Sequence, residues 1–304
     1  MKKLLLTGGT GFIGQQTIPF LQEEGYEIYA VTSKNLTKDN KDVQWLHGNL
    51  MDEEFVSSIF TKIHPTHLLH LAWITTPHVY WNSSENFNWV RASQYMFQCF
   101  IENGGERIVS AGSCAEYDWS EGICLENTTS LRPQSAYSKA KGELYTYLTD
   151  TINKDHTSFA WARVFFAYGP NEAKTRLITS IIRSIIEDRL LDIEYGYHKR
   201  DYIYVADVAS ILVKLLNSDI RGSINIGTGK AISIIEIART VTKLMGVSKE
   251  ITSQIKINSD EKIPLVEADT TILNNNLNYY PTDNIESGIK NTIKWYLECN
   301  NDQT

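Results

Sequence analysis

The sequence has few cysteines, no long apolar run and no excess of positive charge. Its four cysteines show neither a C-x-x-C pair nor another metal-ligand spacing, so we expect a reduced, cytoplasmic protein without a bound metal. No stretch approaches the roughly 20 apolar residues of a membrane-spanning helix. The formal net charge of −7 disfavours general binding to nucleic acid or to a membrane surface and leaves local basic sites possible.

The first half of the chain alternates short apolar runs with helical patterns. This alternation predicts an α/β fold with a doubly wound parallel sheet. Strands are expected at residues 3–7, 27–32, 43–47, 67–71, 107–111 and 158–164. Helices are expected at residues 11–24, 52–63, 83–103 and 135–153, with Asp52 and Ser135 as N-caps and Gly25 and Gly104 as stops.

The pattern loosens after Tyr168-Gly169-Pro170. We therefore predict a first domain over residues 1–165 and a smaller, less regular second domain over 166–304, with a return to the first near 201–226. Helices are expected at 174–188, 206–216, 233–245 and 283–299, strands at 191–195 and 223–226, and a turn at 196–200.

Three glycines spaced three residues apart follow the first predicted strand and open the first helix, at Gly8, Gly11 and Gly14. Glycine permits a tight turn, a close approach of backbone to a phosphate, and close packing of helix on strand. The helix N-terminus then offers N–H groups and a positive dipole end to a pyrophosphate. The stretch predicts a dinucleotide site, with a purely structural turn as the alternative.

The end of the second strand bears on which dinucleotide binds. A carboxylate here accepts hydrogen bonds from the ribose 2′-OH of NAD, and it would repel the 2′-phosphate of NADP. This chain has Thr32, Ser33 and Lys34 instead, and Asp39 lies too far along to replace the acid. We therefore expect NADP (as NADPH) in preference to NAD, although a polar surface loop would have the same residues.

Tyr137 and Lys141 lie one turn apart in a predicted helix. An ammonium near the phenol favours the phenolate and lowers its pKa, which suits acid–base chemistry. An ordinary surface pair is the alternative. Ser113 favours the catalytic interpretation, because it follows the fifth strand, where a doubly wound sheet presents its catalytic groups.

Together these motifs resemble the extended short-chain dehydrogenase/reductases of the NAD-dependent epimerase/dehydratase group. The resemblance covers essentially the whole chain and includes His70-Leu71-Ala72, Arg163-Val164-Phe165, Arg200-Asp201-Tyr202 and Asn225-Ile226-Gly227. It implies a nucleotide-diphosphate sugar substrate, a homodimer built on residues 83–103 and 135–153, and a catalytic triad. In that triad Tyr137 exchanges the proton, Ser113 orients the sugar oxygen, and Lys141 binds the nicotinamide ribose.

The resemblance also implies which residues contact each ligand. The cofactor contacts are expected at Gly8, Gly11, Phe12, Ile13, Gly14, Thr32, Ser33, Lys34, Asn49, Leu50, Leu71, Ala72, Tyr137 and Lys141. The substrate contacts are expected at Trp73, Ser113, Cys114, Ala115, Arg176, Arg200 and Asn225. Arg200 would face the diphosphate, with Arg176 and Asn225 beside it, although a surface arginine in a polar turn is the alternative.

Residues after Ser113 bear on the reaction. Sugar 4,6-dehydratases of this group carry an Asp-Glu pair there, whereas this chain has Cys114 and Ala115, and Glu116 is expected to point away. Dehydration is therefore disfavoured. We expect NADPH-dependent reduction of a dTDP- or CDP-linked 4-keto-6-deoxyhexose at C4. The alternatives are an epimerase that retains NAD and a non-catalytic NADP sensor.

Two weaker signals are interpreted as structural. His64, His67 and His70 recur every three residues, but His67 and His70 fall on opposite faces of a strand, which disfavours a metal site. The aromatic cluster of Trp73, Tyr80, Trp81 and Trp89 is expected in the core, with Trp73 able to line the sugar pocket.

Overall fold

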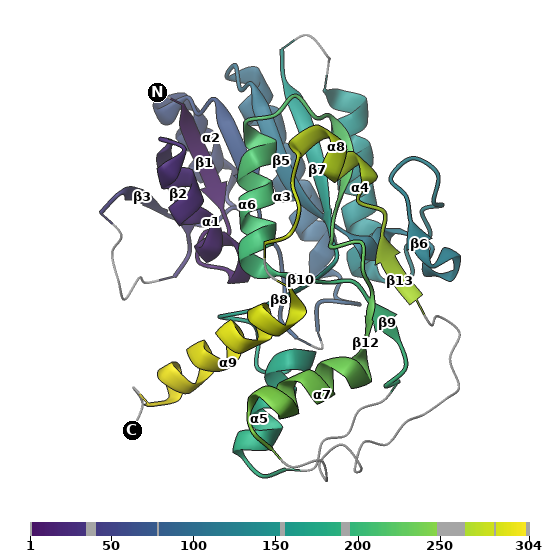
Figure 1. The fold of residues 1–304 in the computed structure, drawn as a ribbon. Helices are drawn as coiled ribbons and strands as arrows, with labels where there is room; N and C mark the ends of the chain where they lie inside the picture. Colours follow the sequence, from purple (N-terminus) through teal and green to yellow (C-terminus); the bar gives the residue numbers. More distant parts are fainter. Residues whose placement is uncertain are drawn as a thin grey trace.

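A computed structural model describes residues 2–34, 41–77, 79–152, 156–189, 195–247, 265–282 and 284–301. Its centre is a seven-stranded parallel sheet in the order β11-β7-β5-β4-β1-β2-β3 (Figure 1). The strands are β1 (Lys3–Thr7), β2 (Glu27–Thr32), β3 (Val43–His47), β4 (His67–His70), β5 (Arg107–Ser113), β7 (Ser158–Val164) and β11 (Gly222–Ile226). The predicted α/β fold with a parallel sheet is confirmed.

Helices cover both faces of this sheet (Figure 1). Because successive side chains of a strand point to opposite faces, Leu4 and Leu6 of β1 join one apolar core and Leu5 joins the other. The first core lies under α1 (Phe12–Glu23) and α6 (Val205–Leu216). The second lies under α2 (Glu53–Ile63), α3 (Glu85–Glu102) and α4 (Ala136–Thr151).

The predicted helix ends of this part are confirmed. The Asp52 carboxylate caps α2 by accepting from the N–H groups of Glu54 (3.0 Å) and Phe55 (3.2 Å). The Ser135 hydroxyl caps α4 by accepting from the N–H of Ser138 at 3.1 Å. Positive φ angles at Gly25 (+72°) and Gly104 (+79°) then let the chain turn away from α1 and α3.

The second half contributes several short elements. A four-stranded mixed sheet has the order β12 (Ile232–Ser233), β9 (Lys199–Arg200), β13 (Leu265–Ala268) and β6 (Ile123–Cys124), and β8 (Phe166–Tyr168) pairs with β10 (Tyr202–Tyr204). The helices are α5 (Leu177–Ile186), α7 (Ile234–Leu244), α8 (Thr271–Leu277) and α9 (Ile285–Asn301), and α5, α7 and α9 share a third apolar core. None of the helices within the described ranges is long and apolar enough to cross a membrane.

Some predictions for this half differ from the structure. The predicted strand at 191–195 lies outside the described residues except for Tyr195, which is in a turn. The predicted turn at 196–200 ends in strand β9, and α5 begins three residues later than predicted. The strand predicted at 223–226 is β11, which pairs with β7 and completes the main sheet. The boundary at residue 165 stays a prediction.

Candidate active site

The glycine loop is shaped by close backbone contacts. Gly8 has φ +74°, and a Cβ there would lie 2.7 Å from the backbone N of Ala72. A Cβ on Gly14 would lie 2.1 Å from the carbonyl oxygen of Gly8, so α1 approaches the loop as closely as backbone allows. No side chain caps α1, whose N-cap is Gly11, so its first-turn N–H groups can bind an anion. These features fit the pyrophosphate of a dinucleotide.

The loop is tied to the neighbouring strand by Thr7. Its hydroxyl lies 2.7 Å from Nδ1 of His70 and accepts from the backbone N–H groups of Leu71 (3.2 Å) and Ala72 (3.3 Å). Nε2 of His70 lies 3.0 Å from the hydroxyl of Ser93. Burial lowers the pKa of His70 to about 3, so the ring is neutral and structural. The described residues contain no group of side chains that could hold a metal ion.

The predicted adenosine side of the site lies at the ends of β2 and β3. Thr32 is buried, and its hydroxyl accepts from the N–H of Lys34 at 3.1 Å, while Ser33 and Lys34 are exposed. Residues 35–40, with Asp39, lie outside the described ranges. The side chain of Asn49 accepts from the N–H of Met51 at 3.0 Å, and Leu50 packs on the second core.

The structure brings Ser113, Tyr137 and Lys141 together. Ser113 is the last residue of β5, its hydroxyl accepts from the N–H of Ala115 at 3.2 Å, and it hydrogen-bonds to the phenol of Tyr137. Nζ of Lys141 lies 6.0 Å from the ring centroid of Tyr137 and donates to the carbonyl oxygen of Ala111 at 2.9 Å. The three side chains come from β5 and from two successive turns of α4.

The predicted effect of Lys141 on the pKa of Tyr137 is wrong for this structure. The rings of Tyr80 and Trp81 pack edge-on against Tyr137, with centroids at 5.1 and 5.6 Å. Burial raises the pKa of Tyr137, and the hydrogen bond from Ser113 acts in the opposite direction. The phenol is therefore protonated at neutral pH.

Lys141 is itself buried and lies against an aromatic face. Its Nζ is 3.7 Å from the ring centroid of Trp73, whose indole N–H donates to Asn86 at 2.8 Å. Burial lowers the pKa of Lys141 to about 7, and the charge on Glu116 raises it.

The prediction that Tyr80 and Trp81 belong to the core is wrong, because both rings cover Tyr137 and Trp81 is 37% exposed. Trp73 packs on the second core and also holds the lysine.

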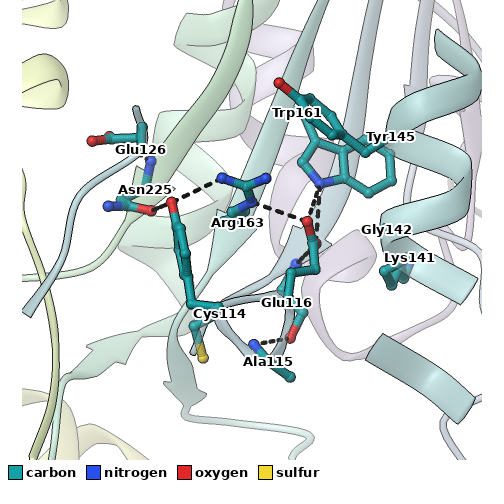
Figure 2. A network of polar contacts seen from close by, with 12 residues as sticks. Cys114, Ala115, Glu116, Glu126, Lys141, Gly142, Tyr145, Trp161, Arg163 and Asn225 are labelled. Atoms are coloured by element: carbon teal, nitrogen blue, oxygen red, sulfur yellow. Dashed lines mark hydrogen bonds and ion pairs between the residues drawn. The ribbon is translucent and has the colours of Figure 1, made fainter. Parts of the chain in front are cut away.

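The residues after Ser113 are buried. Cys114 belongs to a small apolar cluster and Ala115 is also buried, and burial raises the pKa of the Cys114 thiol well above its usual range. Neither can act as a general acid or base at neutral pH. Glu116 turns away from the site, as expected, and pairs with Arg163 at 2.9 Å (Figure 2).

Both predicted substrate arginines, Arg176 and Arg200, lie near the phenol of Tyr202. Arg200 is buried, with its guanidinium carbon 5.9 Å from the centroids of Trp119 and Phe166, so it is not a surface arginine. Arg176 is 43% exposed and lines a cavity of about 220 Å³ together with Phe166 and Tyr202. Both arginines lower the pKa of Tyr202, which burial raises.

Asn225 does not reach this cavity. It is fully buried, and its amide donates to the carbonyl oxygens of Cys124 (2.8 Å) and Asp269 (3.1 Å) while accepting from the hydroxyl of Tyr117 (2.8 Å). Every polar atom of the side chain is thereby used within the protein. In this structure Asn225 joins β11 to the segments around β6 and β13, and the substrate contact at Asn225 stays a prediction.

Sequence reasoning missed Tyr202 and Glu172, which both line the cavity beside Arg176. Burial raises the pKa of Glu172 to about 7, opposed by the charge of Arg176, whose Nε lies 3.5 Å away. The available signal was position alone, since Tyr202 is part of the motif Arg200-Asp201-Tyr202 and Glu172 follows Tyr168-Gly169-Pro170, but neither was assigned a ligand.

Comparisons with known proteins find relatives in sequence and in fold. Mouse dTDP-D-glucose 4,6-dehydratase is 23% identical over 97% of this chain and 88% of its own. The ADP-L-glycero-D-manno-heptose-6-epimerase of Nitratidesulfovibrio vulgaris is 28% identical over 79% of this chain and 80% of its own. The structure of Thermus thermophilus UDP-glucose 4-epimerase in complex with NAD superposes with a TM-score of 0.82 at 21% identity, covering 97% and 99% of the two chains.

The family pattern described as "NAD dependent epimerase/dehydratase family" matches residues 4–227, from β1 through β11. This range contains the glycine loop, Ser113, Tyr137 and Lys141. A nicotinamide dinucleotide is therefore the cofactor class of this site. The chain belongs to the NAD dependent epimerase/dehydratase family.

Proposed function

We propose that this chain transfers a hydride at C4 of a nucleotide-diphosphate sugar, as an NADPH-dependent reductase of a 4-keto-6-deoxyhexose linked to dTDP or CDP. The observation that carries reduction is the end of β2, where Thr32, Ser33 and Lys34 provide no carboxylate to repel a 2′-phosphate. Tyr137 would be the proton donor that reduction of a ketone to an alcohol requires.

The proposed substrate site lies between the catalytic residues and the two arginines. Arg200 and Arg176 would face the diphosphate, since a guanidinium can pair with phosphate oxygens in a bidentate fork. Trp73, Cys114 and Ala115 would border the sugar. With neither an acid nor a base at Cys114 and Ala115, the site lacks the groups that dehydration across two carbons needs.

A bound nicotinamide dinucleotide supplies or accepts the hydride, and the glycine loop, the α1 N-terminus and Lys141 are the groups that would hold it. The Ser113 hydroxyl accepts from the N–H of Ala115 and donates to the phenol of Tyr137 in this structure, and it would turn its proton to the sugar oxygen when substrate binds. Tyr137 donates to the same oxygen. As negative charge develops on that oxygen both hydrogen bonds strengthen, and Tyr137 then gives up its proton.

The second candidate is a nucleotide-sugar 4-epimerase that retains NAD. The comparisons favour it over the reductase, because the named relatives include epimerases and no reductase, and the Thermus thermophilus epimerase was solved with NAD. The third reading, a non-catalytic NADP sensor, is disfavoured because Ser113, Tyr137 and Lys141 are all present and adjacent.

One assay separates the candidates. The purified chain is analysed for bound nicotinamide and then incubated with NADPH and a panel of nucleotide 4-keto-6-deoxy sugars and UDP-hexoses, with products identified by NMR. A reductase oxidises NADPH in proportion to the C4 alcohol formed. Bound NAD(H) with epimer formation and no net NADPH oxidation selects the epimerase. If no sugar of either kind reacts, both candidates are wrong.

A further inference from the structure

A buried carboxylate lies directly beneath the catalytic group. Glu116 is 1% exposed and accepts four hydrogen bonds (Figure 2). The backbone N–H of Ser113 donates at 2.7 Å, the indole N–H of Trp161 donates to both oxygens at 3.0 and 3.1 Å, and Nε of Arg163 donates at 2.9 Å. Such complete pairing is needed to keep a charge buried.

The local backbone is built around this contact. Ser113 and Glu116 form a capping box over one turn, in which Ser113 accepts from the N–H of Ala115 and Glu116 accepts from the N–H of Ser113. Gly112 makes the arrangement possible, because a Cβ there would lie 2.2 Å from the indole nitrogen of Trp161 and 2.8 Å from Oε1 of Glu116. The carboxylate therefore fixes the backbone that carries the Ser113 hydroxyl.

Arg163 balances the charge and extends the network. Its guanidinium also donates to the hydroxyl of Tyr117 at 3.0 Å, and that hydroxyl donates to Asn225 on β11 at 2.8 Å (Figure 2). The backbone N–H of Asn225 in turn donates to Glu126 at 2.9 Å. The network thus runs from Ser113 across β7 to β11, with buried carboxylates at both ends.

Glu116 and Lys141 contact the same end of β5. Nζ of Lys141 donates to the carbonyl oxygen of Ala111 at 2.9 Å, and Oε1 of Glu116 lies against the next two residues, Gly112 and Ser113. The titratable groups facing Lys141 are Tyr137 on its own helix, His70 on β4, and Glu116. His70 is neutral, and Tyr137 is protonated at neutral pH. Burial lowers the pKa of Lys141, and the charge on Glu116 raises it. Without that charge the ammonium form would be harder to keep in the site.

We infer that Glu116 is a positioning residue of this active site, which sets the place of the Ser113 hydroxyl by accepting from the backbone N–H of Ser113 and which provides a buried negative charge for the Lys141 ammonium. The inference rests on the proposed catalytic role of Ser113 and Lys141. The competing reading is that Glu116 serves only as the buried partner of Arg163, in which case its charge has no effect on Lys141.

The test uses Glu116→Gln, a neutral isostere, with Glu126→Gln as the matched control at the far end of the network. In Glu116→Gln, kcat falls by about 10- to 100-fold, since small displacements of catalytic groups cost this much. The alkaline limb of the kcat/KM profile moves to lower pH, whereas Glu126→Gln keeps the wild-type profile. A wild-type kcat and pH profile in Glu116→Gln overturns the inference.

A second measurement is independent of turnover. The Lys141 side-chain amine is titrated by NMR in ¹⁵N-lysine-labelled protein, and its midpoint falls in Glu116→Gln and stays unchanged in Glu126→Gln. An unchanged midpoint in both overturns the inference, whatever the enzyme's substrate proves to be. A third outcome separates the two proposals. If the Lys141 midpoint falls only in Glu116→Gln but the wild type turns over no nucleotide sugar, the proposed function fails and the effect of Glu116 on Lys141 stands.

Glu116→Gln leaves the Arg163 guanidinium buried without its carboxylate partner. If that variant does not fold, the double variant Glu116→Gln/Arg163→Gln replaces it, because it removes both buried charges. In a folded double variant the Lys141 midpoint still falls, because the carboxylate is absent. A wild-type midpoint in the double variant overturns the inference.

Discussion

Lys141→Met removes a buried ammonium while keeping a side chain of similar length. Burial lowers the pKa of Lys141 from 10.5 to about 7 in the folded chain. Between these values the unfolded chain binds more protons than the folded one, so this group makes the free energy of unfolding rise with pH across that window. At one pKa unit per 1.36 kcal/mol, it destabilises the fold by about 4 kcal/mol at pH 7 and by about 2 kcal/mol at pH 9.

We therefore expect Lys141→Met to be more stable than wild type at pH 7 in the cofactor-free state, and to lose that advantage as pH rises. The measurement is urea unfolding of both proteins at pH 7 and pH 9. The gain in unfolding free energy shrinks by about 2 kcal/mol between the two. Packing differences between the side chains do not depend on pH, so they leave this change intact.

Lys139→Met is the matched control, because Lys139 lies exposed on the same helix. Its difference from wild type should stay constant over the same pH range. A constant difference for Lys141→Met as well would refute the reasoning, since it would mean that Lys141 titrates alike in the folded and unfolded chains.

Two further predictions concern ligand binding. Gly14→Ala places a Cβ 2.1 Å from the carbonyl oxygen of Gly8, so it should cost about 1–3 kcal/mol and weaken dinucleotide binding, as followed by thermal unfolding and titration. Gly142→Ala meets no atom within 4 Å and should stabilise α4 by up to about 1 kcal/mol without affecting binding; equal behaviour of the two variants would contradict this. Arg200→Ala should raise the KM for the nucleotide sugar by about 10- to 100-fold and leave the cofactor KM unchanged, while exposed Arg132→Ala changes neither. An effect on the cofactor KM would instead place Arg200 on the cofactor side.

The main sheet could be predicted because each of its strands is an apolar run bounded by turn residues. Strands β6, β8, β10 and β12 could not, since two or three residues are too few to show a period of two. These short strands pair with partners far along the chain, as β6 at Ile123–Cys124 does with β13 at Leu265–Ala268. The residues of one short strand do not indicate which distant segment it pairs with.

The cluster of Ser113, Tyr137 and Lys141 could be predicted from spacing, but the environment of each side chain could not. Tyr137 and Lys141 were placed on one face of a helix, and the structure has them there. The spacing gave no sign that Tyr80 and Trp81 would cover Tyr137, so the direction of its pKa change was predicted wrongly. Burial and charge at a site depend on segments that meet only in the folded chain.

Asn225 shows the same limit. The family resemblance predicted Asn225 beside Arg176 and Arg200, whereas in the structure its amide donates hydrogen bonds to the carbonyl oxygens of Cys124 and Asp269. The expected homodimer, the domain boundary at residue 165 and the choice of NADP over NAD stay predictions.

The central claim is that Tyr137 and its neighbours deliver a proton to a sugar oxygen while a hydride arrives at C4. It is tested most directly with NADPH carrying deuterium at the transferred position, incubated with dTDP- and CDP-linked 4-keto-6-deoxyhexoses and wild type or Tyr137→Phe. We predict deuterium at C4 of the product with wild type, and no product with Tyr137→Phe although it still binds NADPH. Near-normal turnover by Tyr137→Phe would contradict the account.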